Sequence, residues 1–427
     1  MPGKAKTFSI NILGTRQIYT VDPENAKALF STQWQQFLPA PLRRNAAIFP
    51  FADRGISLVD GEEWKEAQAL SKSFFERDNY ANTDRLGPFM DRLLELLPED
   101  GATFDMHPFI QRWTLDVSTI VFFGENLDSL NHPERVKVTE AMLDVQRGAR
   151  VRLVFSKLRW LMPMKWWFEA IAYVHQFLDS HVKKTYQEIE EREKRVKAGL
   201  EVEPERTDLL WNMALNLRDD IVGLRSNIAL IFAPNGDPTN SYITNAIWQL
   251  ARHPAAWEKV REEVLAHGDA PLTFTALRNM KYLMAVLNEA QRLMPGSLIQ
   301  ARTAGVDTTL PTGGGPDGTM PIFVRKGDII SLHRNVLHWD QDIWGADAKE
   351  FRPERWEHRR SFWTFIPFGG GPRRCPAQMI VSCQASYVIA RLAQRYRKIE
   401  ARDPGPYIPV VRIAPSNKNG VKIALYK

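Results

Sequence analysis

The residues best suited to chemistry lie in segment 365–377, which reads FIPFGGGPRRCPA. Its three consecutive glycines let the backbone approach a flat ligand closely, because glycine has no side chain to clash. Pro376 suits the first position of a helix, so we expect Cys375 at a helix N-terminus, where free N–H groups and the helix dipole stabilise a thiolate. The segment therefore predicts a metal-ligating cysteine, and a buried free cysteine beside a loop is the plainer alternative.

Two patterns of charged residues precede this segment. Glu289 and Arg292 are three residues apart on a helix predicted over residues 276–294, so they share a face and can pair. Such a pair is common on solvated helix faces and carries little information by itself. It is followed, however, by segment 351–356, FRPERW, which contains Arg355, and then by the cysteine segment. The order of the three segments makes the pair informative.

The elements that must position these residues are predicted to be mostly helical. Residues 7–13 and 16–21 alternate in polarity and meet at a glycine, which predicts a β-hairpin. The glycine-rich segment 311–318 is predicted to be a loop. The predicted helices include residues 86–97, 173–198, 219–252, 276–294 and 376–395. The expected fold class is mainly α with a small β region.

The composition is that of an intracellular globular enzyme. The chain has 427 residues, is 44% hydrophobic and contains two cysteines, Cys375 and Cys383, which argues against a disulfide scaffold. The net charge is +6, but the basic residues are dispersed, which disfavours nucleic acid and leaves an anionic membrane or an acidic redox partner. No segment is apolar enough to span a membrane. Segment 158–168 interleaves tryptophans with basic residues and predicts either peripheral membrane contact or an aromatic cluster over the core or a pocket.

The spacing Phe-x-x-Gly-x-Arg-x-Cys, formed by Phe368, Gly371, Arg373 and Cys375, resembles the heme-binding loop of the cytochromes P450. The resemblance implies the cytochrome P450 fold in a single catalytic domain over residues 1–427, with Cys375 as the axial ligand of a heme b iron. The pattern is closest to the fungal branch that includes alkane and fatty-acid hydroxylases. The N-terminal membrane anchor of that branch is not in this sequence, so it is either absent or removed.

The same resemblance gives Glu289, Arg292 and Arg355 the task of bracing the loop that holds the thiolate. It implies a monooxygenase that oxidises an apolar small molecule, a lipid or a secondary metabolite, with O2 and with electrons from NADPH through a separate reductase. We expect a monomer at the surface of the endoplasmic reticulum if the full-length protein has an anchor, and in the cytoplasm otherwise.

The central helix departs from the family pattern. Residues 234–239 stand where the family usually has Ala/Gly-Gly-x-Asp/Glu-Thr-Thr. The acid is kept as Asp237, which we expect to feed protons, but Pro238 replaces the threonine whose hydroxyl helps to deliver them. Thr239 or Asn240 could shift into its place. We also expect Pro234 and Pro238 to open the helix locally, because each removes a helical hydrogen bond.

The positions that usually anchor the heme propionates depart as well. The family's early Trp-x-x-x-Arg runs here from Trp64 to Gln68, and Ile299 stands where a second partner is usual. Arg302, at an odd offset from Ile299 on a strand, is predicted to face away. Arg373 then remains in an expected place, with help from Lys65, and Trp64 is a further candidate for cofactor binding.

These departures leave two alternatives to the monooxygenase open. One is a non-oxidative or peroxide-dependent heme-thiolate enzyme, such as an isomerase, a lyase or a cyclisation catalyst, which needs no threonine. The other is a catalytically inactive binding protein on the same fold.

Overall fold

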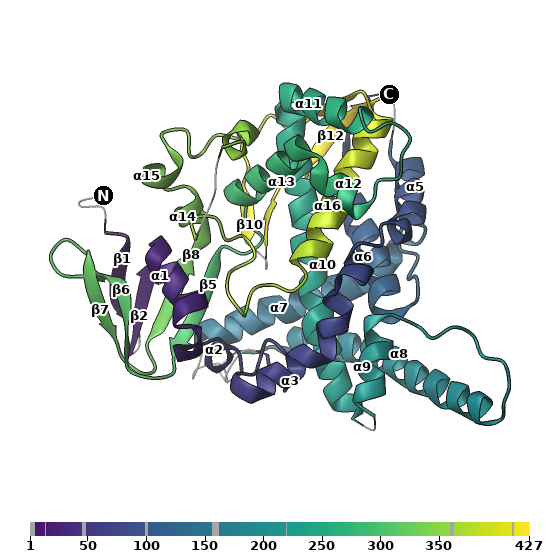
Figure 1. Ribbon diagram of the computed structural model, residues 1–427, viewed down its shortest axis with the longest axis horizontal. Coiled ribbons are helices and arrows are strands. Elements are labelled where there is room, and N and C mark those ends of the chain that lie inside the picture. The colour runs from purple at the N-terminus through teal and green to yellow at the C-terminus, as the bar shows by residue number, and fades with distance from the viewer. Residues whose placement is uncertain are drawn as a thin grey trace. The chain divides into compact units, whose positions relative to one another are not determined.

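The computed structural model describes residues 5–12, 14–44, 48–98, 101–155, 162–218, 220–358, 363–411 and 414–427. They form two compact units. The first unit comprises Met1–Pro41, Leu97–His107 and Pro238–Lys427, and the second comprises Leu42–Leu96 and Pro108–Asp237. Helices dominate the ribbon and the strands form small sheets (Figure 1). The predicted fold class, mainly α with a small β region, is therefore confirmed.

The main sheet of the first unit has the strand order β1-β2-β8-β5-β3. Strands β1 and β2 form the predicted hairpin, with Gly14 at a φ of 82° in the turn. Strand β8 pairs in parallel with β2 and antiparallel with β5, where Ile299 lies opposite His333. The strands are β1 Thr7–Ile12, β2 Thr15–Thr20, β3 Phe37–Leu38, β5 Ile299–Ala304 and β8 Ile329–His333.

The smaller sheets also belong to the first unit. They contain β4 Phe104–Asp105, β6 Thr308–Gly314, β7 Met320–Val324, β9 Lys398–Ala401, β10 Pro409–Val411, β11 Pro415–Asn417 and β12 Lys422–Tyr426. The expected loop over 311–318 is partly wrong, because β6 continues to Gly314. A shift of register between Leu310 and Gly314, with Gly313 at a φ of 115°, lets the strand pass through the glycines as a bulge.

The helices that support the cysteine segment lie in the first unit. They are α11 Pro254–Leu265, α12 Phe274–Asn279, α13 Lys281–Leu293, α14 Arg334–His338, α15 Gln341–Trp344 and α16 Gln378–Arg395, and a short 3-10 turn covers Pro353–Trp356. The helix predicted over 276–294 is thus two helices, because Met280 leaves the helical conformation at a ψ of 89°. A short helix, α1 Pro23–Lys27, follows β2.

The second unit is built from helices. They are α3 Gly61–Lys72, α4 Arg77–Tyr80, α5 Gly87–Leu96, α7 Lys137–Phe155, α8 Lys165–Lys197 and α9 Leu209–Asn216. Three further helices have residues in both units: α2 Ala40–Arg44, α6 His107–Phe123 and α10 Ile221–Arg252.

Helix α10 is continuous through both prolines, so the expected local opening of the helix is wrong. The two prolines are four residues apart and therefore share one side of the helix. Pro234 is exposed and Pro238 is half-buried, so this side of the helix is not dry at the prolines. A missing bond costs less there than in a dry core.

Candidate active site

The cysteine loop, residues 365–377, makes a tight turn that ends just before α16. The backbone N–H of Cys375 donates to the carbonyl of Phe368 over 3.0 Å, which closes the turn. Gly371 has a φ of 64°, and a Cβ built there would lie 1.6 Å from the carbonyl oxygen of Phe30. That oxygen belongs to the backbone and cannot rotate away. Only glycine therefore fits position 371. The close backbone approach that the glycines predict is, at Gly371, an approach to the protein's own backbone at Phe30.

The Cys375 side chain is exposed, so a ligand can reach its sulfur. Protein atoms still surround it closely, and this desolvation raises the pKa of the thiol. The backbone N–H of Ala377 and the cations Arg334 and Arg374 act in the opposite direction and lower the pKa. The same groups stabilise the thiolate, which is the form that binds a metal.

Glu289 and Arg292 lie on α13, and Arg355 lies on the turn Pro353–Trp356; the structure brings all three together. Glu289 Oε1 accepts from Arg292 Nη2 at 2.8 Å and from Arg355 Nε at 2.8 Å. Its Oε2 accepts from Arg292 Nε at 2.9 Å and from Trp356 Nε1 at 3.0 Å. The side chains of Glu289 and Arg292 are fully buried. The backbone N–H of Arg352 also donates to Oε1, over 3.0 Å. A carboxylate held by five donors at this depth is a rigid structural anchor.

His338 connects this anchor to the cysteine loop. Its carbonyl accepts from Arg292 Nη1 over 2.8 Å, and its Nε2 accepts from the backbone N–H of Ile366 over 3.1 Å. Burial lowers the pKa of His338 to about 3, with further lowering by Arg334 and Arg292, so the ring is neutral at pH 7. Because Nε2 accepts, the ring proton is on Nδ1. The sequence analysis missed His338, although a histidine beside two apolar residues, Val336 and Leu337, was a signal for a buried ring.

Arg334 is a second residue that the sequence analysis missed. It directly follows β8, and its backbone N–H donates to the carbonyl of Leu298 over 2.8 Å. Its side chain is 5% exposed, and Nη1 donates to the carbonyl of Pro367 over 2.7 Å. Burial lowers the pKa of Arg334 to about 10, while the nearby Cys375 acts to raise it. The guanidinium is therefore a charged group inside the protein, next to the cysteine loop.

Three candidates on α10 are buried: Asp237, Thr239 and Asn240. Among the described residues, the hydroxyl of Thr239 has no hydrogen-bond partner. The Nδ2 of Asn240 lies 3.1 Å from His107 Nε2, at the start of α6. Pro238 lies near Gly296, where an added Cβ would be 3.9 Å from the proline Cβ.

Asn240 and Pro238 lie on different sides of α10. Each residue advances the helix by about 100°, so the side chains of these two residues, two positions apart, point about 200° apart around the helix axis. Tyr242, four residues after Pro238, shares its side and stacks edge-on at 6.4 Å from Phe368 of the cysteine loop. The structure therefore places Pro238 on the side of α10 that faces the cysteine loop, and Asn240 on the opposite side.

The remaining candidates for heme contact lie on several elements. Phe368 and Arg373 are half-buried in the cysteine loop. In the second unit, Trp64 is buried on α3, while Lys65 is exposed and pairs with Glu62 on its own helix at 2.6 Å.

Ile299 and Arg302 face opposite sides of β5, as the two-residue period of a strand predicts. Ile299 is 50% exposed, while Arg302 is buried with its guanidinium 5.0 Å from the centre of the Phe30 ring.

The segment predicted to touch a membrane, 158–168, lies partly outside the described residues. In its described part Trp167 is fully buried and donates through Nε1 to the carbonyl of Val145 over 2.9 Å. Phe168 is 50% exposed. Among the helices of the described residues, none is long and apolar enough to cross a membrane.

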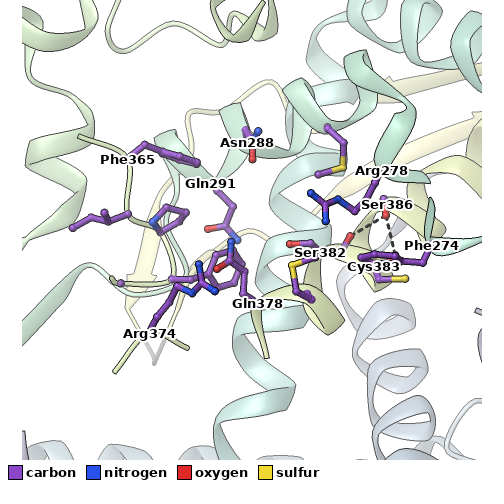
Figure 2. Close-up of a pocket in the computed structure, with 16 residues that line it drawn as sticks. Phe274, Arg278, Asn288, Gln291, Phe365, Arg374, Gln378, Ser382, Cys383 and Ser386 are labelled. Carbon is purple, nitrogen blue, oxygen red and sulfur yellow. Dashed lines mark hydrogen bonds between the residues drawn. The ribbon is translucent and has the colours of Figure 1, made fainter. Parts of the chain in front are cut away.

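A pocket of ≈ 250 Å³ lies between the cysteine loop and helices α12, α13 and α16 (Figure 2). Asn288 and Gln291 of α13, Phe365 and Arg374 of the loop, and Cys383 of α16 are among its lining residues. Burial raises the pKa of Cys383 to about 12. This second thiol is therefore protonated at neutral pH and is no competitor of Cys375 for a metal.

Comparison with known proteins identifies the class. The family model of cytochrome P450 matches residues 4–409. The cytochrome P450 monooxygenase iliC of Neonectria sp. (strain DH2) is 55% identical over 423 residues, 99% of this chain and 84% of the relative. Cytochrome P450 monooxygenase apdE of Emericella nidulans is 54% identical over 423 residues, 99% of this chain and 81% of the relative. A second iliC, from Hypocrea jecorina, is 50% identical over 427 residues, 100% of this chain and 95% of the relative.

The chain belongs to the cytochrome P450 family, and the predicted resemblance is confirmed. It is a heme-thiolate monooxygenase that acts on a small molecule and receives electrons from a redox partner. These relatives do not favour an isomerase, a lyase or an inactive binding protein. The residues present fit a heme-thiolate group: the cysteine is exposed, the turn before it tolerates no Cβ at Gly371, and the N–H of Ala377 and two cations favour the thiolate.

Proposed function

We propose that the protein is a heme b monooxygenase in which Cys375 is the axial ligand and the electrons come from NADPH through a separate reductase. The observation that carries the proposal is the accessible Cys375 sulfur at the end of a turn that only glycine permits. When bound, a heme with a thiolate ligand supplies the activation of O2, because sulfur donates electron density that favours O–O cleavage.

The loop residues would hold and shield the cofactor. Phe368, Gly371 and Arg373 come to this role by the family pattern, and the half-burial of Phe368 and Arg373 supports it. Trp64 and Lys65 of α3 are proposed as further contacts for the propionates. Lys65 is exposed and its partner Glu62 is a surface residue, so Lys65 is free to exchange that ion pair for a propionate.

The anchor Glu289–Arg292–Arg355 would keep the loop in place during turnover. It contacts the loop through His338, whose carbonyl and ring bind Arg292 and Ile366 respectively. This role is structural, because five donors occupy the Glu289 carboxylate and hold it in place.

Asp237 is our candidate for the proton donor on α10, and the hydroxyl of Thr239 is a second candidate, two residues further and therefore about 200° around the helix. Burial of both side chains and the unpartnered hydroxyl support this choice. Asn240 is a weaker candidate, because its side chain is held by His107 on the side of α10 opposite Pro238. We therefore propose a packing role for Asn240.

The substrate class that we propose is an apolar small molecule, a lipid or a secondary metabolite. The fungal relatives named as P450 monooxygenases support this class, and so do the accessible apolar residues Pro234, Pro238 and Ile299. We further propose that residues 1–427 act as a single catalytic domain and a monomer. Contact with the endoplasmic reticulum membrane through 158–168 is a proposal that the exposed Phe168 supports.

Two measurements on the purified protein test this function. The first is the absorption spectrum of the dithionite-reduced protein under carbon monoxide, where a red-shifted Soret band reports a thiolate ligand. The second is the consumption of O2 with NADPH, a P450 reductase and a panel of apolar substrates. The band together with substrate-dependent uptake is the expected result. Uptake that persists in a reductase-free control, or no band at all, contradicts the proposal.

A further inference from the structure

Arg334 is a buried cation without a buried anion beside it. Its side chain is 5% exposed, and within the described ranges it forms no ion pair with a carboxylate. Its Nη1 binds the carbonyl of Pro367, and its Nε is buried without any partner among the described residues. Arg292, in contrast, is fully buried but has the carboxylate of Glu289. A guanidinium that leaves water without a counter-charge is unfavourable, so Arg334 calls for an anion.

The contacts of Arg334 place it beside the loop that carries the Cys375 thiol. The carbonyl that Arg334 binds is that of Pro367, and the next carbonyl along the chain, that of Phe368, accepts the N–H of Cys375. One dipeptide therefore connects the guanidinium and the cysteine. The backbone of Arg334 is fixed as well, because its N–H donates to Leu298 at the end of the β5–β8 ladder. The guanidinium is thus held in place by the sheet on one side and by the cysteine loop on the other.

We propose that Arg334 is the counter-charge of the Cys375 thiolate and that it tunes the electron density which the sulfur gives to a bound iron. The inference rests on the proposed function of Cys375 as the iron ligand. Arg374 is also near the thiol, but it is exposed, and water and salt screen its charge. Arg334 is buried and acts through a medium of low dielectric constant, where a charge is felt most strongly.

The charge has a definite effect on reduction of the iron. Reduction adds one electron to a centre that already carries an anionic sulfur ligand. A fixed cation close to that ligand favours the state with the extra electron. Loss of the cation therefore favours the oxidised state and lowers the reduction potential. Arg334 is in this account a positioning residue, which acts on the iron through Cys375.

The test is the midpoint potential of the heme-loaded protein, measured by spectroelectrochemistry in three variants. Arg334→Met removes the charge, and Arg334→Lys keeps it. Arg374→Met is the matched control, because it removes an exposed cation from the same loop. We expect Arg334→Met to shift the equilibrium between reduced and oxidised iron at least tenfold toward the oxidised state, which is a fall of about 59 mV for one electron. Arg334→Lys should restore most of the shift, and Arg374→Met should change the equilibrium less than threefold.

The outcomes separate this inference from the function on which it rests. If the unmodified protein lacks the red-shifted Soret band under carbon monoxide, the proposed role of Cys375 fails first. If the band is present and Arg334→Met keeps the original potential, Arg334 is not the counter-charge. Equal shifts in Arg334→Met and Arg334→Lys overturn the inference too, because they assign the effect to the hydrogen bond with Pro367. If Arg334→Met loses heme, the midpoint potential of Arg334→Lys tests the inference instead. A potential equal to that of the unmodified protein supports the inference, and a lower one contradicts it.

Discussion

The ring Nε2 of His338 accepts the backbone N–H of Ile366 over 3.1 Å. This contact joins two parts of the chain that the sequence leaves separate. On one side Arg292, held by Glu289, donates to the carbonyl of the same histidine. On the other side Ile366 begins the turn that ends at Cys375. One residue therefore carries the rigidity of the buried anchor to the loop that presents the thiol.

Replacement of His338 by leucine should weaken the loop. Leucine fills the volume but leaves the N–H of Ile366 buried without an acceptor, which costs about 1–3 kcal/mol. We expect the free energy of unfolding to fall by that amount and heme to dissociate faster. His338→Gln is the matched control, because a glutamine oxygen can accept in place of Nε2. Denaturant unfolding measures the first effect and transfer of heme to apomyoglobin the second. Equal behaviour of the two variants would show that the contact is unimportant.

His338 should also make stability depend on pH. The folded protein keeps this ring neutral, with a pKa of about 3, against an ordinary value of 6.5. Below pH 6.5 the unfolded chain binds a proton that the folded chain refuses, so stability falls as the pH drops toward 3 and is complete above 6.5. At pH 5.5 the loss due to this residue is about 1.4 kcal/mol.

The comparison of wild type with His338→Gln isolates that contribution. Other histidines with lowered pKa, His175 and His333, titrate in both proteins and cancel. Unfolding free energies at pH 7.5 and 5.5 give the difference directly. A wild-type protein that loses no more stability than the variant between these two pH values would contradict the assignment.

Much of this site could be predicted from sequence because its parts are local. The segment around Cys375 carries its glycines, proline and cysteine within thirteen consecutive residues, and helical periodicity marked α8 and α10 within a few residues, apart from the earlier start of α8. Asn240 could have been set apart from Pro238 by helix phase alone.

Arg334 and His338 could not be predicted in the same way. They act on backbone groups of Pro367 and Ile366, about thirty residues away. No side-chain pattern encodes a contact with a carbonyl or an N–H. The continuity of α10 was missed for a similar reason, because the penalty of a helical proline depends on whether its side of the helix is dry.

Gly371→Ala should disrupt the cysteine loop. The new Cβ would be strained at a φ of 64° and would meet the Phe30 carbonyl at 1.6 Å, so the turn must move. Gly318→Ala is the control: its φ is 75°, but nothing lies within 4 Å of the added carbon. Gly318→Ala should therefore cost only the backbone strain of about 1–2 kcal/mol. We expect Gly371→Ala to lose heme and Gly318→Ala to keep it, as read from the ratio of Soret to protein absorbance.

Glu289→Gln should destabilise the protein more than any exposed substitution. It removes the charge between Arg292 and Arg355 and leaves the buried Arg292 without its carboxylate, while Arg355 keeps its pair with Asp347. Breaking one partner of a buried pair costs about 3–5 kcal/mol. Glu190→Gln is the control, because its pair with Lys194 is on the surface of α8. Thermal unfolding should show a large fall for the first variant and none beyond error for the second. A Glu289→Gln protein as stable as wild type would show that the Glu289 carboxylate does not act as a structural anchor.

Asp237→Asn tests the proton route on α10. An amide of the same shape cannot cycle a proton, and removal of such a group slows a reaction by about 10²–10⁴-fold. We expect substrate oxidation with O2 and reductase to fall at least tenfold while carbon monoxide binding and substrate affinity stay unchanged. Pro238→Ala is the paired variant: it restores a helical N–H without adding a hydroxyl, so it should stabilise α10 and leave the solvent isotope effect on turnover as in wild type. If Asp237→Asn turns over normally, the relay must start elsewhere, and Thr239→Ala becomes the variant that locates it. A loss in Asp237→Asn that peroxide in place of O2 restores would place the defect in proton delivery, because peroxide already carries the protons that reduction of O2 has to collect.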